Sequence, residues 1–565
     1  MKRAIHTLVL ALGAVLLALP AAAGAKGGPP DQAGEKAQTT EIQILGLNDF
    51  HGNLRPPDET SSSGRIGPAL PVGIAAGGIE YLATHVRQLE ATNPKNTLFV
   101  SAGDLIGASP LISAAFHDEP TIEGFNLMDL DYNGVGNHEF DEGVDELLRM
   151  QNGGCHPVDG CLDGDPFLGA DFDFLAANVK YKDTGETIFP PYVIHHFPGV
   201  KVAVVGMTLE GTPSIVTASA VASVDFFDEA DSVNALVPEL QKKGIETIIV
   251  LLHEGGSVTD SLSQATMNNC TNPTGPVVDV VDRMHPAIDL VVTGHTNWAV
   301  NCVRPDGKVV TGAASFGRLV TDIDLTVSRA TKDVLRDETK VNNVIVTRDV
   351  TRAPDLTALV SKYSELAAPT ENRVVGEATA PLTRTPNTAG ESSLGDIIAD
   401  AQLWATTAVP GGGAQISFMN AGGIRTDINA GPITFGEAFS VQPFGNILVT
   451  MTMTGAQIDA VLEQQFTGGN GILQIPASLT YTRHPASAAP DRVRNIMING
   501  APLDVLASYR VTVNNFLADG GDSYTVFRQG TNRFFGEIDL DAFARYLTAT
   551  APTSPGPQNR ITLVP

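Results

Sequence analysis

The sequence has few basic residues and a single long apolar run. Lys and Arg number 36 against 63 Asp and Glu, which gives a formal net charge of −27. This negative charge disfavours nonspecific binding to nucleic-acid polymers and to anionic membranes. The apolar run, residues 8–23, follows a basic start and precedes small residues, as in a secretory signal peptide; a retained membrane anchor is the alternative. No other segment approaches the roughly 20 apolar residues of a membrane span.

The N-terminal pattern predicts an exported protein. We expect a signal peptide over residues 1–25 and a disordered leader, rich in Gly, Pro, Gln and Lys, over residues 26–40. The mature chain should be periplasmic or extracellular and free of the membrane. The sequence does not indicate its oligomeric state.

Cysteine is scarce, with four in 565 residues, and none belongs to a Cys-x-x-Cys metal motif. An even number in an exported chain favours two disulfides rather than a catalytic thiol. Four cysteines permit three connectivities. We expect Cys155–Cys161 and Cys270–Cys302, because each bond would tether a loop beside the polar segments described next.

Five short segments carry side chains that bind divalent metal ions. Four of them follow apolar, β-rich runs, at residues 42–47, 97–101, 245–252 and 288–292. Ligands collect beyond the carboxyl ends of strands in an open α/β sheet, so loops far apart in sequence can converge there. We therefore expect one shared site. The segments are Asp49-Phe50-His51, Gly103-Asp104, Gly136-Asn137-His138-Glu139, His253-Glu254-Gly255 and Gly294-His295-Thr296-Asn297.

These residue types predict a pair of metal ions. Two metals about 3.5–4 Å apart can generate hydroxide at neutral pH and stabilise the attacking and leaving oxygens. Imidazole and carboxamide ligands limit the negative charge and keep the ions Lewis acidic. The expected ligands are Asp49, His51 and Asn297 for one ion, Asn137, His253 and His295 for the other, and Asp104 as the bridge. Mn, Zn, Co or Mg could serve. The alternative is that these residues form turns that cap helices.

His138 and Asp141 are the expected catalytic pair. A histidine beside a metal ligand can protonate a leaving oxygen or stabilise charge on a phosphoryl group. Asp141 could accept the other ring N–H and fix the tautomer, although it could instead cap a helix over residues 142–148. Glu139 and Glu254 are expected to support the ligands rather than to bind metal.

Four further segments in the second half combine glycine, aromatic and polar residues. They are Ser393-Leu394-Gly395-Asp396, Asn420-Ala421-Gly422-Gly423-Ile424-Arg425, Gln442-Pro443-Phe444-Gly445-Asn446 and Asn515-Phe516-Leu517-Ala518-Asp519-Gly520-Gly521-Asp522. With the five metal segments, they resemble the periplasmic and ecto-5′-nucleotidase family. The resemblance implies an α/β fold of two domains, an N-terminal four-layer αββα calcineurin-like metallophosphoesterase sandwich and a C-terminal α/β nucleotide-recognition domain.

The C-terminal segments predict a nucleotide clamp. Arg425 supplies a fork for a phosphate or ribose oxygen, and Phe444 and Phe516 could stack on a base. A single phenylalanine is more often part of a core, but in the family the matching positions form the base clamp, and Asp522 matches the ribose-binding acid. The expected substrate-binding residues are Asn420, Arg425, Phe444, Asn446, Phe516 and Asp522.

Two features depart from the family pattern. Asn297 stands where family members commonly have His or Gln, and its shorter side chain offers a carbonyl oxygen with less reach. The family's additional arginine before the Leu-Gly-Asp-like segment has no match at the usual offset. Arg384 is the nearest candidate.

The boundary between the two domains is expected near residues 351–372. These residues have the spacing of a linker helix, after a phosphoesterase domain at 41–350 and before a recognition domain at 373–565. Because metals and clamp lie on different domains, hinge-like closure is expected. The expected activity is hydrolysis of nucleotide phosphate esters. Alternatives are a UDP-sugar or nucleoside di- or triphosphate hydrolase, a 2′,3′-cyclic-nucleotide phosphodiesterase, and a nucleotide-binding protein with weak catalysis.

Overall fold

The computed structural model describes residues 38–564, apart from 60–61, 409–410 and 468–470. The expected signal peptide at residues 1–25 lies outside the described residues, as does the expected leader at 26–40 up to residue 37. The end of that leader belongs to the first strand, β1 (Thr39–Leu47). Among the described residues, no helix has the length and apolar character needed to cross a membrane.

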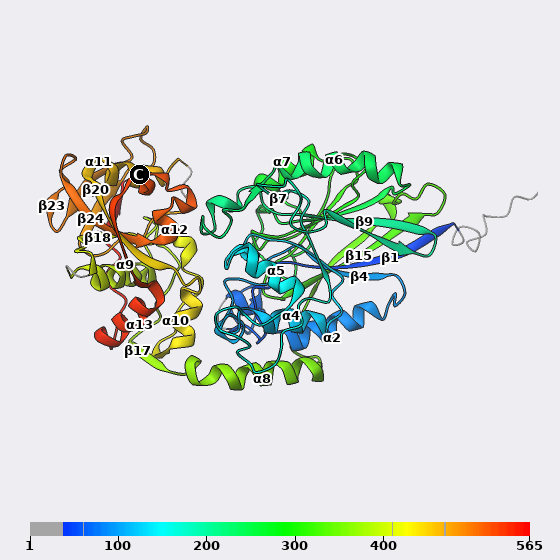
Figure 1. Cartoon of the computed structure of the whole chain (residues 1–565), viewed down its shortest axis with the longest axis horizontal. Helices are drawn as coiled ribbons and strands as arrows, with labels where there is room; N and C mark the ends of the chain where they lie inside the picture. Colours follow the sequence, from blue (N-terminus) through cyan, green and yellow to red (C-terminus); the bar gives the residue numbers. More distant parts are fainter. Residues whose placement is uncertain (1–37, 60–61, 409–410, 468–470, 565) are drawn as a thin grey trace, which may run out of the picture.

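The N-terminal domain contains two six-stranded mixed sheets (Figure 1). The first has the order β16 (Lys340–Ile345), β15 (Leu319–Ser328), β1, β4 (Thr97–Ser101), β5 (Tyr132–Gly134) and β6 (Asp173–Leu175). The second has the order β13 (Ala299–Val303), β14 (Val309–Ala313), β12 (Leu290–Thr293), β11 (Thr247–Leu252), β9 (Val200–Met207) and β8 (Tyr192–Phe197).

The two sheets pack face to face and are covered by helices on both outer sides. Ile44 and Val100 of the first sheet share a buried apolar cluster with Val204 and Leu251 of the second, because both faces of each sheet are apolar. Outside the first sheet lie α2 (Ile79–Glu90), α4 (Glu119–Asn126) and α5 (Val144–Asn152). Outside the second lie α6 (Glu229–Lys242) and α7 (Pro276–Arg283). The expected four-layer α/β sandwich is confirmed.

Each of the five metal segments follows a strand. The strands β1, β4 and β5 run parallel to one another in the first sheet, and β11 and β12 run parallel in the second. Their carboxyl ends therefore deliver all five loops to one end of the sandwich. The sequence did not predict β5, which precedes Gly136-Asn137, because three residues are too few to show a period.

Helix α8 (Pro354–Glu371) follows the last strand of the sandwich and runs along its lower edge in Figure 1. Its buried residues Leu356, Val360 and Tyr363 belong to the core of the N-terminal domain. Arg55 forms an ion pair with Glu371, at 2.5 Å, near the end of the helix. This helix therefore packs as part of the first domain.

The C-terminal domain has two four-stranded sheets, a two-stranded sheet and several helices. The sheets are β18 (Ile416–Ser417), β24 (Ser508–Asn514), β20 (Ile447–Thr454) and β25 (Thr531–Ile538); β23 (Ala501–Pro502), β22 (Val493–Ile498), β21 (Leu479–Arg483) and β26 (Ile561–Leu563); and β17 (Val374–Ala378) with β19 (Gly431–Thr434). The helices include α9 (Ser393–Thr406), α10 (Phe435–Val441), α11 (Gly455–Gln464), α12 (Asn515–Ala518) and α13 (Asp539–Thr550). Within residues 415–419, which precede Asn420, only Ile416–Ser417 form a strand.

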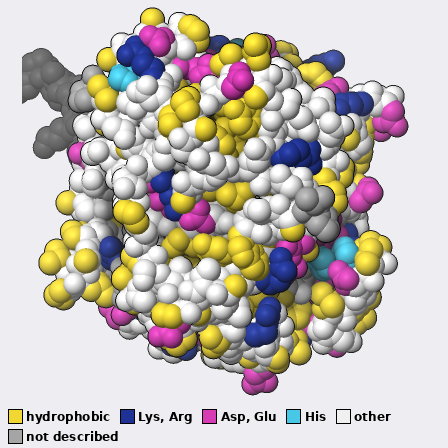
Figure 2. Space-filling view, turned by 90° about the vertical axis from the view of Figure 1, so that its left-hand side faces the viewer, with side chains coloured by type: hydrophobic (Ala, Val, Ile, Leu, Met, Phe, Trp, Pro, Cys, Tyr) yellow, Lys and Arg dark blue, Asp and Glu magenta, His cyan; other side chains and the backbone are white. Residues whose placement is uncertain are grey.

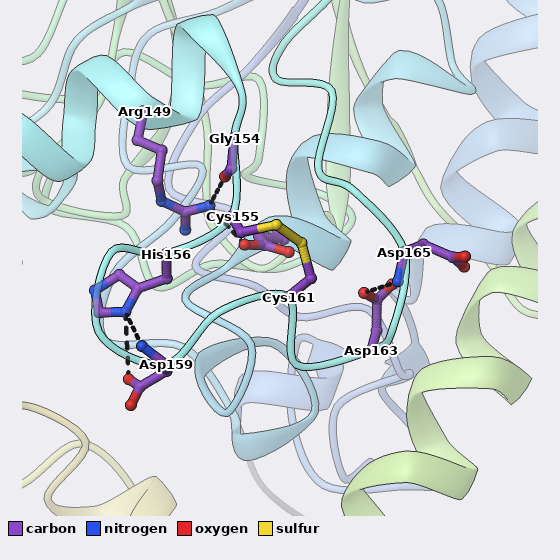
Figure 3. The surroundings of a disulfide bond; sticks show 9 residues. Arg149, Gly154, Cys155, His156, Asp159, Cys161, Asp163 and Asp165 are labelled. Carbon is purple, nitrogen blue, oxygen red and sulfur yellow. Dashed lines mark hydrogen bonds and ion pairs between the residues drawn. A yellow bond between two sulfur atoms is a disulfide. The ribbon is translucent and has the colours of Figure 1, made fainter.

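Both expected disulfides are present, Cys155–Cys161 and Cys270–Cys302. The first closes a small loop after α5, shown in Figure 3. The second joins the segment before α7 to β13. Disulfides of this kind are typical of proteins outside the cytoplasm.

Candidate metal and nucleotide site

Asp104 lies at the centre of the metal segments. Its Oδ2 is 3.1 Å from Nε2 of His253 and 3.7 Å from Nε2 of His51. The Nε2 atom of His51 is also 3.9 Å from Oδ1 of Asp49. One carboxylate thus faces imidazoles from two sides, as a bridging ligand would.

The second group of expected ligands gathers around Asn137. Its Oδ1 is 3.1 Å from Nε2 of His253 and 2.9 Å from Nδ1 of His295. Asn297 lines the same cavity as His51 and Asn137. The structure thus brings together the seven residues that the sequence nominated as metal ligands.

Five of these seven residues have left-handed backbone conformations, which non-glycine residues rarely adopt. They are Asp49, His51, Asp104, His295 and Asn297, with φ values of 50°, 48°, 53°, 70° and 56°. Such conformations cost about 1–3 kcal/mol each and persist where the surrounding structure enforces them, often at functional sites. Their concentration in the loops after β1, β4 and β12 sets this end of the sandwich apart.

Backbone carbonyls orient two of the imidazoles. The Nδ1 of His51 lies 2.9 Å from the carbonyl oxygen of Gly107, and the Nδ1 of His253 lies 2.7 Å from that of Ala102. A carbonyl can only accept, so each Nδ1 donates and each Nε2 keeps its lone pair for the site. The roles of Gly107 and Ala102 could not be predicted from the sequence, because every residue type has the same main-chain carbonyl.

Two further side chains hold the ligand loops in place. Glu139 accepts hydrogen bonds from the backbone N–H groups of Asp104, Leu105 and Gly136, at 2.8–2.9 Å. Asn48, which the sequence analysis missed, donates to the Asp49 carboxylate and to the carbonyl of Ala314. Glu254, which was also expected to support the ligands, accepts a hydrogen bond from the backbone N–H of the adjacent Gly255.

The donor set suits two divalent cations. Ligands about 2.0–2.1 Å from a tetrahedral ion lie about 3.3 Å apart, and the shortest donor separations here are 2.9–3.1 Å. Asp49 and Asp104 are fully buried, and their ion-pair partners within the described residues are histidines alone. Buried carboxylates require compensating positive charge. Imidazole, carboxamide and carboxylate donors together suit divalent cations such as the expected Mn, Zn, Co or Mg.

His138 and Asp141 form the expected pair. Nδ1 of His138 lies 2.8 Å from Oδ2 of Asp141. Burial lowers the pKa of His138, but the Asp141 and Asp104 carboxylates outweigh burial and hold that pKa above its usual value. Helix α5 begins at Val144 after Gly143 and has no side-chain cap, so Asp141 does not serve as its N-cap.

A cavity of about 270 Å³ joins the metal segments to the C-terminal domain. From the first domain it is lined by His51, Asp104, Asn137, His138, Asp141, Ile215, Val216, Thr217, His295 and Asn297. From the second it is lined by Asn420, Gly422, Gly423, Arg425, Phe444, Asn446, Phe516 and Asp522. All six residues expected to bind substrate therefore share one space with five of the seven expected metal ligands. The sequence analysis did not predict that residues 215–217 line this cavity, because they belong to none of the nine segments that it singled out.

Phe444 packs beside His138 as well as lining the cavity. Its ring lies nearly parallel to that of His138, with 5.7 Å between centroids and an angle of 17°. The guanidinium of Arg425 lies 5.7 Å from the centre of the Phe444 ring. Phe516 lies against Gly521 in a different part of the cavity wall.

Asn420 and Asp522 are hydrogen-bonded to each other. Nδ2 of Asn420 donates to Oδ2 of Asp522 at 2.8 Å, and Nδ2 of Asn514 donates to Oδ1 of Asn420 at 3.1 Å. Asp522 is 6% exposed and has a left-handed φ of 53°. Asn514 was missed, although it directly precedes the Asn515-Phe516 segment.

Arg384 lies close enough to Arg425 for the two charges to interact. Burial lowers the pKa of Arg425, and the positive charge of Arg384 lowers it further. Both arginines also line a second cavity, of about 980 Å³, which shares Asn297 and Arg425 with the first. Arg384 therefore lies near Arg425, although its position in the sequence differs from that of the family's additional arginine.

Comparison with known proteins agrees with this geometry. The calcineurin-like phosphoesterase family matches residues 42–298, and the C-terminal domain family of 5′-nucleotidases matches residues 374–529. A cell wall protein of Listeria monocytogenes is 31% identical over 543 residues, which cover 90% of this chain and 67% of the relative. The chain belongs to the 5′-nucleotidase family. Its first domain is therefore that of a metallophosphoesterase, whose buried His and Asp clusters suit a binuclear metal site.

Other relatives of this family member differ in length and name. An endonuclease of Bacillus subtilis, YhcR, is 32% identical over 510 residues, but the chain spans only 39% of its length. A solved structure of a 5′-nucleotidase precursor from Thermus thermophilus aligns with 93% of this chain and 99% of its own, with a TM-score of 0.74 and 26% identity. Both domains therefore have their counterparts in a known structure.

Proposed function

We propose that the protein hydrolyses nucleoside 5′-monophosphates to nucleoside and phosphate in a reaction that depends on two divalent metal ions. The observation that carries this proposal is the shared cavity, in which residues of the recognition domain face the metal segments. Its volume of about 270 Å³ is just below the range of roughly 300–1,000 Å³ typical of ligand pockets, which favours a small nucleotide.

The proposed metal ligands are Asp104 and the six residues gathered near it, namely Asp49, His51, Asn137, His253, His295 and Asn297. When bound, the two ions would supply a nucleophile at neutral pH and electrophilic stabilisation of the phosphoryl oxygens. His138 holds its Nδ1 proton toward Asp141, which leaves Nε2 to donate to the departing 5′ oxygen. The direction of its pKa shift supports this role, because the Asp141 and Asp104 carboxylates favour the form of the imidazole in which both nitrogens carry a proton.

The second domain positions the substrate in this proposal. Phe444 and Phe516 stack on the base, and Arg425 offsets the negative charge of the phosphate. Asn420 fixes one oxygen of Asp522, and the carboxylate can accept hydrogen bonds from ribose hydroxyls. Asn446, which is buried in the same wall, completes the polar lining.

A nucleotide with a longer phosphate chain or a sugar substituent is the second candidate substrate. The cavity of about 980 Å³ beside the first one supports it, because Arg384 and Arg425 could hold a further phosphate there. A polymer fits the charge of the chain less well. In Figure 2, Lys and Arg side chains on the face of the C-terminal domain lie in separate spots rather than in one continuous surface.

We also propose that the mature protein acts outside the cytoplasm, in the periplasm or the medium. Two disulfides and the signal-like N-terminal sequence support this location. The name of the Listeria relative, a cell wall protein, agrees with it.

The experiment is a substrate and metal screen with purified mature protein. AMP, ADP, ATP, UDP-glucose, 2′,3′-cyclic AMP and an aryl phosphate are each incubated with Mn²⁺, Zn²⁺, Co²⁺, Mg²⁺ or a chelator, and the products are separated by chromatography. Asp104→Asn serves as the control without a bridging carboxylate. Preference for AMP that the chelator abolishes is the expected result.

Each other outcome of this screen would favour one of the alternative functions. Preference for ADP, ATP or UDP-glucose would make the second cavity part of the substrate site. Cleavage confined to the cyclic nucleotide would change the reaction to phosphodiester hydrolysis. Nucleotide binding without hydrolysis under any metal would overturn the enzymatic proposal in favour of a binding protein.

A further inference from the structure

Outside the candidate active site, two histidines and two carboxylates from three segments meet at the surface of the N-terminal domain. His117 lies between α3 (Leu111–Ala114) and α4, and Glu142 lies just before α5. His156 and Asp159 lie on the small loop closed by the Cys155–Cys161 disulfide (Figure 3). None of the four has a role in the proposed nucleotide hydrolysis.

The nitrogen atoms of both histidines converge on one carboxylate oxygen. Oδ2 of Asp159 is 3.0 Å from Nε2 of His117 and 3.3 Å from Nδ1 of His156. Both separations are close to the edge of about 3.3 Å in a tetrahedral zinc site. Nδ1 of His156 also accepts the backbone N–H of Asp159 at 3.1 Å, a hydrogen bond that a metal ion at this nitrogen would replace. The opposite nitrogen of His117, Nδ1, lies 2.8 Å from Oε2 of Glu142.

The nearby cationic side chains, Arg149 and Lys362, form ion pairs with other carboxylates rather than with these four residues. Arg149 is paired with Glu119 and Glu146, at 2.6 Å each, so the nearby Glu146 already has a strong cationic partner. Lys362 is paired with Asp163, farther along the loop. Among the ion pairs of the described residues, Asp159 and Glu142 have only histidine partners.

This arrangement repeats the carboxylate–histidine–metal pattern of known zinc sites, in which an outer carboxylate accepts one ring N–H and leaves the other nitrogen for the metal. Glu142 would be that outer carboxylate. The rings of His117 and His156 are stacked, with 3.8 Å between centroids and 17° between planes. A shared ion requires a wider angle between the two rings, so binding would require the His156 side chain to rotate out of its stack on His117.

We propose that His117, His156 and Asp159 form a third metal site, which takes a single Zn²⁺ ion with water as the fourth ligand and Glu142 as the outer carboxylate. Two imidazoles and a carboxylate are ligands that Zn²⁺ binds well, and an open fourth position is common for it. The ion would join the disulfide loop to the segment between α3 and α4, and Glu142 would link this segment to the one that carries His138 and Asp141.

The position of this site connects it to the nucleotide site. Glu142 directly follows Asp141, which holds His138. A cavity of about 340 Å³ is lined by His117 and Glu142 on one side and by Phe439, Pro443 and Phe444 of the C-terminal domain on the other. An ion here would stiffen the wall against which the recognition domain closes.

The competing explanation is a protonated His117 held by two carboxylates. Hydrogen bonding to Glu142 raises the pKa of His117, to about 9, which such an ion pair would also require. Protonation and metal binding at Nε2 exclude each other, so counting bound metal separates the two explanations.

The experiment counts zinc per chain in the full mature protein. Protein stripped with chelator is dialysed against micromolar Zn²⁺ and analysed by mass spectrometry of the metal. His156→Gln and Asp159→Asn change side chains that are partly exposed, at 16% and 47%. His196→Gln, at an exposed position on β8, is the matched control. Circular dichroism checks that each variant is folded.

The expected result is one Zn²⁺ fewer in His156→Gln and in Asp159→Asn than in the parent protein, with no change in His196→Gln. Glu142→Gln should weaken binding of that ion roughly 10–100-fold. Crystals of the parent protein grown with Zn²⁺ should show an anomalous zinc peak between His117 and Asp159.

Equal zinc counts in the parent and both variants, or a crystal without that peak, would overturn the third site and leave the protonated ion pair. The difference between parent and variants tests this site, whereas the number of ions that remain in the variants tests the binuclear centre. Failure of the third site is therefore distinguishable from failure of the proposed phosphoesterase.

Discussion

Removal of the Phe444 side chain tests two proposed roles at once, stacking on the base and packing beside His138. Base stacking on an aromatic ring contributes about 1–3 kcal/mol, which corresponds to a rise of roughly 5–150-fold in KM for AMP. Phe444 also lies parallel to the His138 ring, so Phe444→Ala should lower kcat as well. Phe516 lies against Gly521 instead, so Phe516→Ala should raise KM by a similar factor and leave kcat unchanged.

The assay compares AMP with p-nitrophenyl phosphate, which has no nucleobase. Both variants should keep the parent KM for the aryl phosphate, and only Phe444→Ala should lower kcat for both substrates. Phe535→Ala is the control, because this phenylalanine of the same domain is 61% exposed. If KM rises equally for AMP and for the aryl phosphate in both variants, the rings do not bind the base and the reasoning is refuted.

Three further predictions concern the acid, the metal centre and stability. His138→Ala should lower kcat roughly 10²–10⁴-fold with metal content unchanged; loss of metal would make His138 a ligand instead. A methyl group at position 136 would overlap the Asp104 carboxylate, so Gly136→Ala should lose bound metal and activity while circular dichroism stays unchanged; retained metal would contradict this contact. Burial raises the pKa of Asp539 from 3.8 to about 8, so the folded state favours the protonated carboxyl group. The contribution of this group to the free energy of unfolding is therefore fully present below about pH 4 and is lost as the pH rises to about 8. Asp539→Asn should therefore raise the free energy of unfolding at pH 8, relative to the parent, by at least about 1.4 kcal/mol, with little change at pH 4; denaturant titrations that show the same pH dependence in both proteins would exclude this effect.

Much of the first domain could be predicted because its strands are long and apolar. The runs that became β1 and β4 end directly at polar residues, and a parallel sheet brings such ends together. The short strand β5 carried too few residues for any pattern. Sequence reasoning reached Asn137 through its own motif rather than through its strand.

The parts that the sequence could not supply depend on the main chain or on tertiary proximity. The carbonyls of Gly107 and Ala102 orient two histidines, and any residue type offers a carbonyl. Arg384 lies near Arg425 although helix α9 and strand β18 separate them in the sequence, and its guanidinium donates to the carbonyl of Ile424, a proximity that residue spacing does not define. The cluster around His117 joins three segments, one of them held in shape by a disulfide.

Helix α8 determines where the molecule can be divided. Sequence similarity to the phosphoesterase family ends at residue 298, but strands β14 and β15 and the buried face of α8 still belong to the same folded body. A recombinant fragment that stopped at residue 298 or 350 would leave the apolar surface beneath Tyr363 open to water and prone to aggregation. The smallest fragment expected to fold alone ends at Glu371, where the ion pair with Arg55 anchors the helix. Any hinge between the two domains would then be confined to the few residues between α8 and β17.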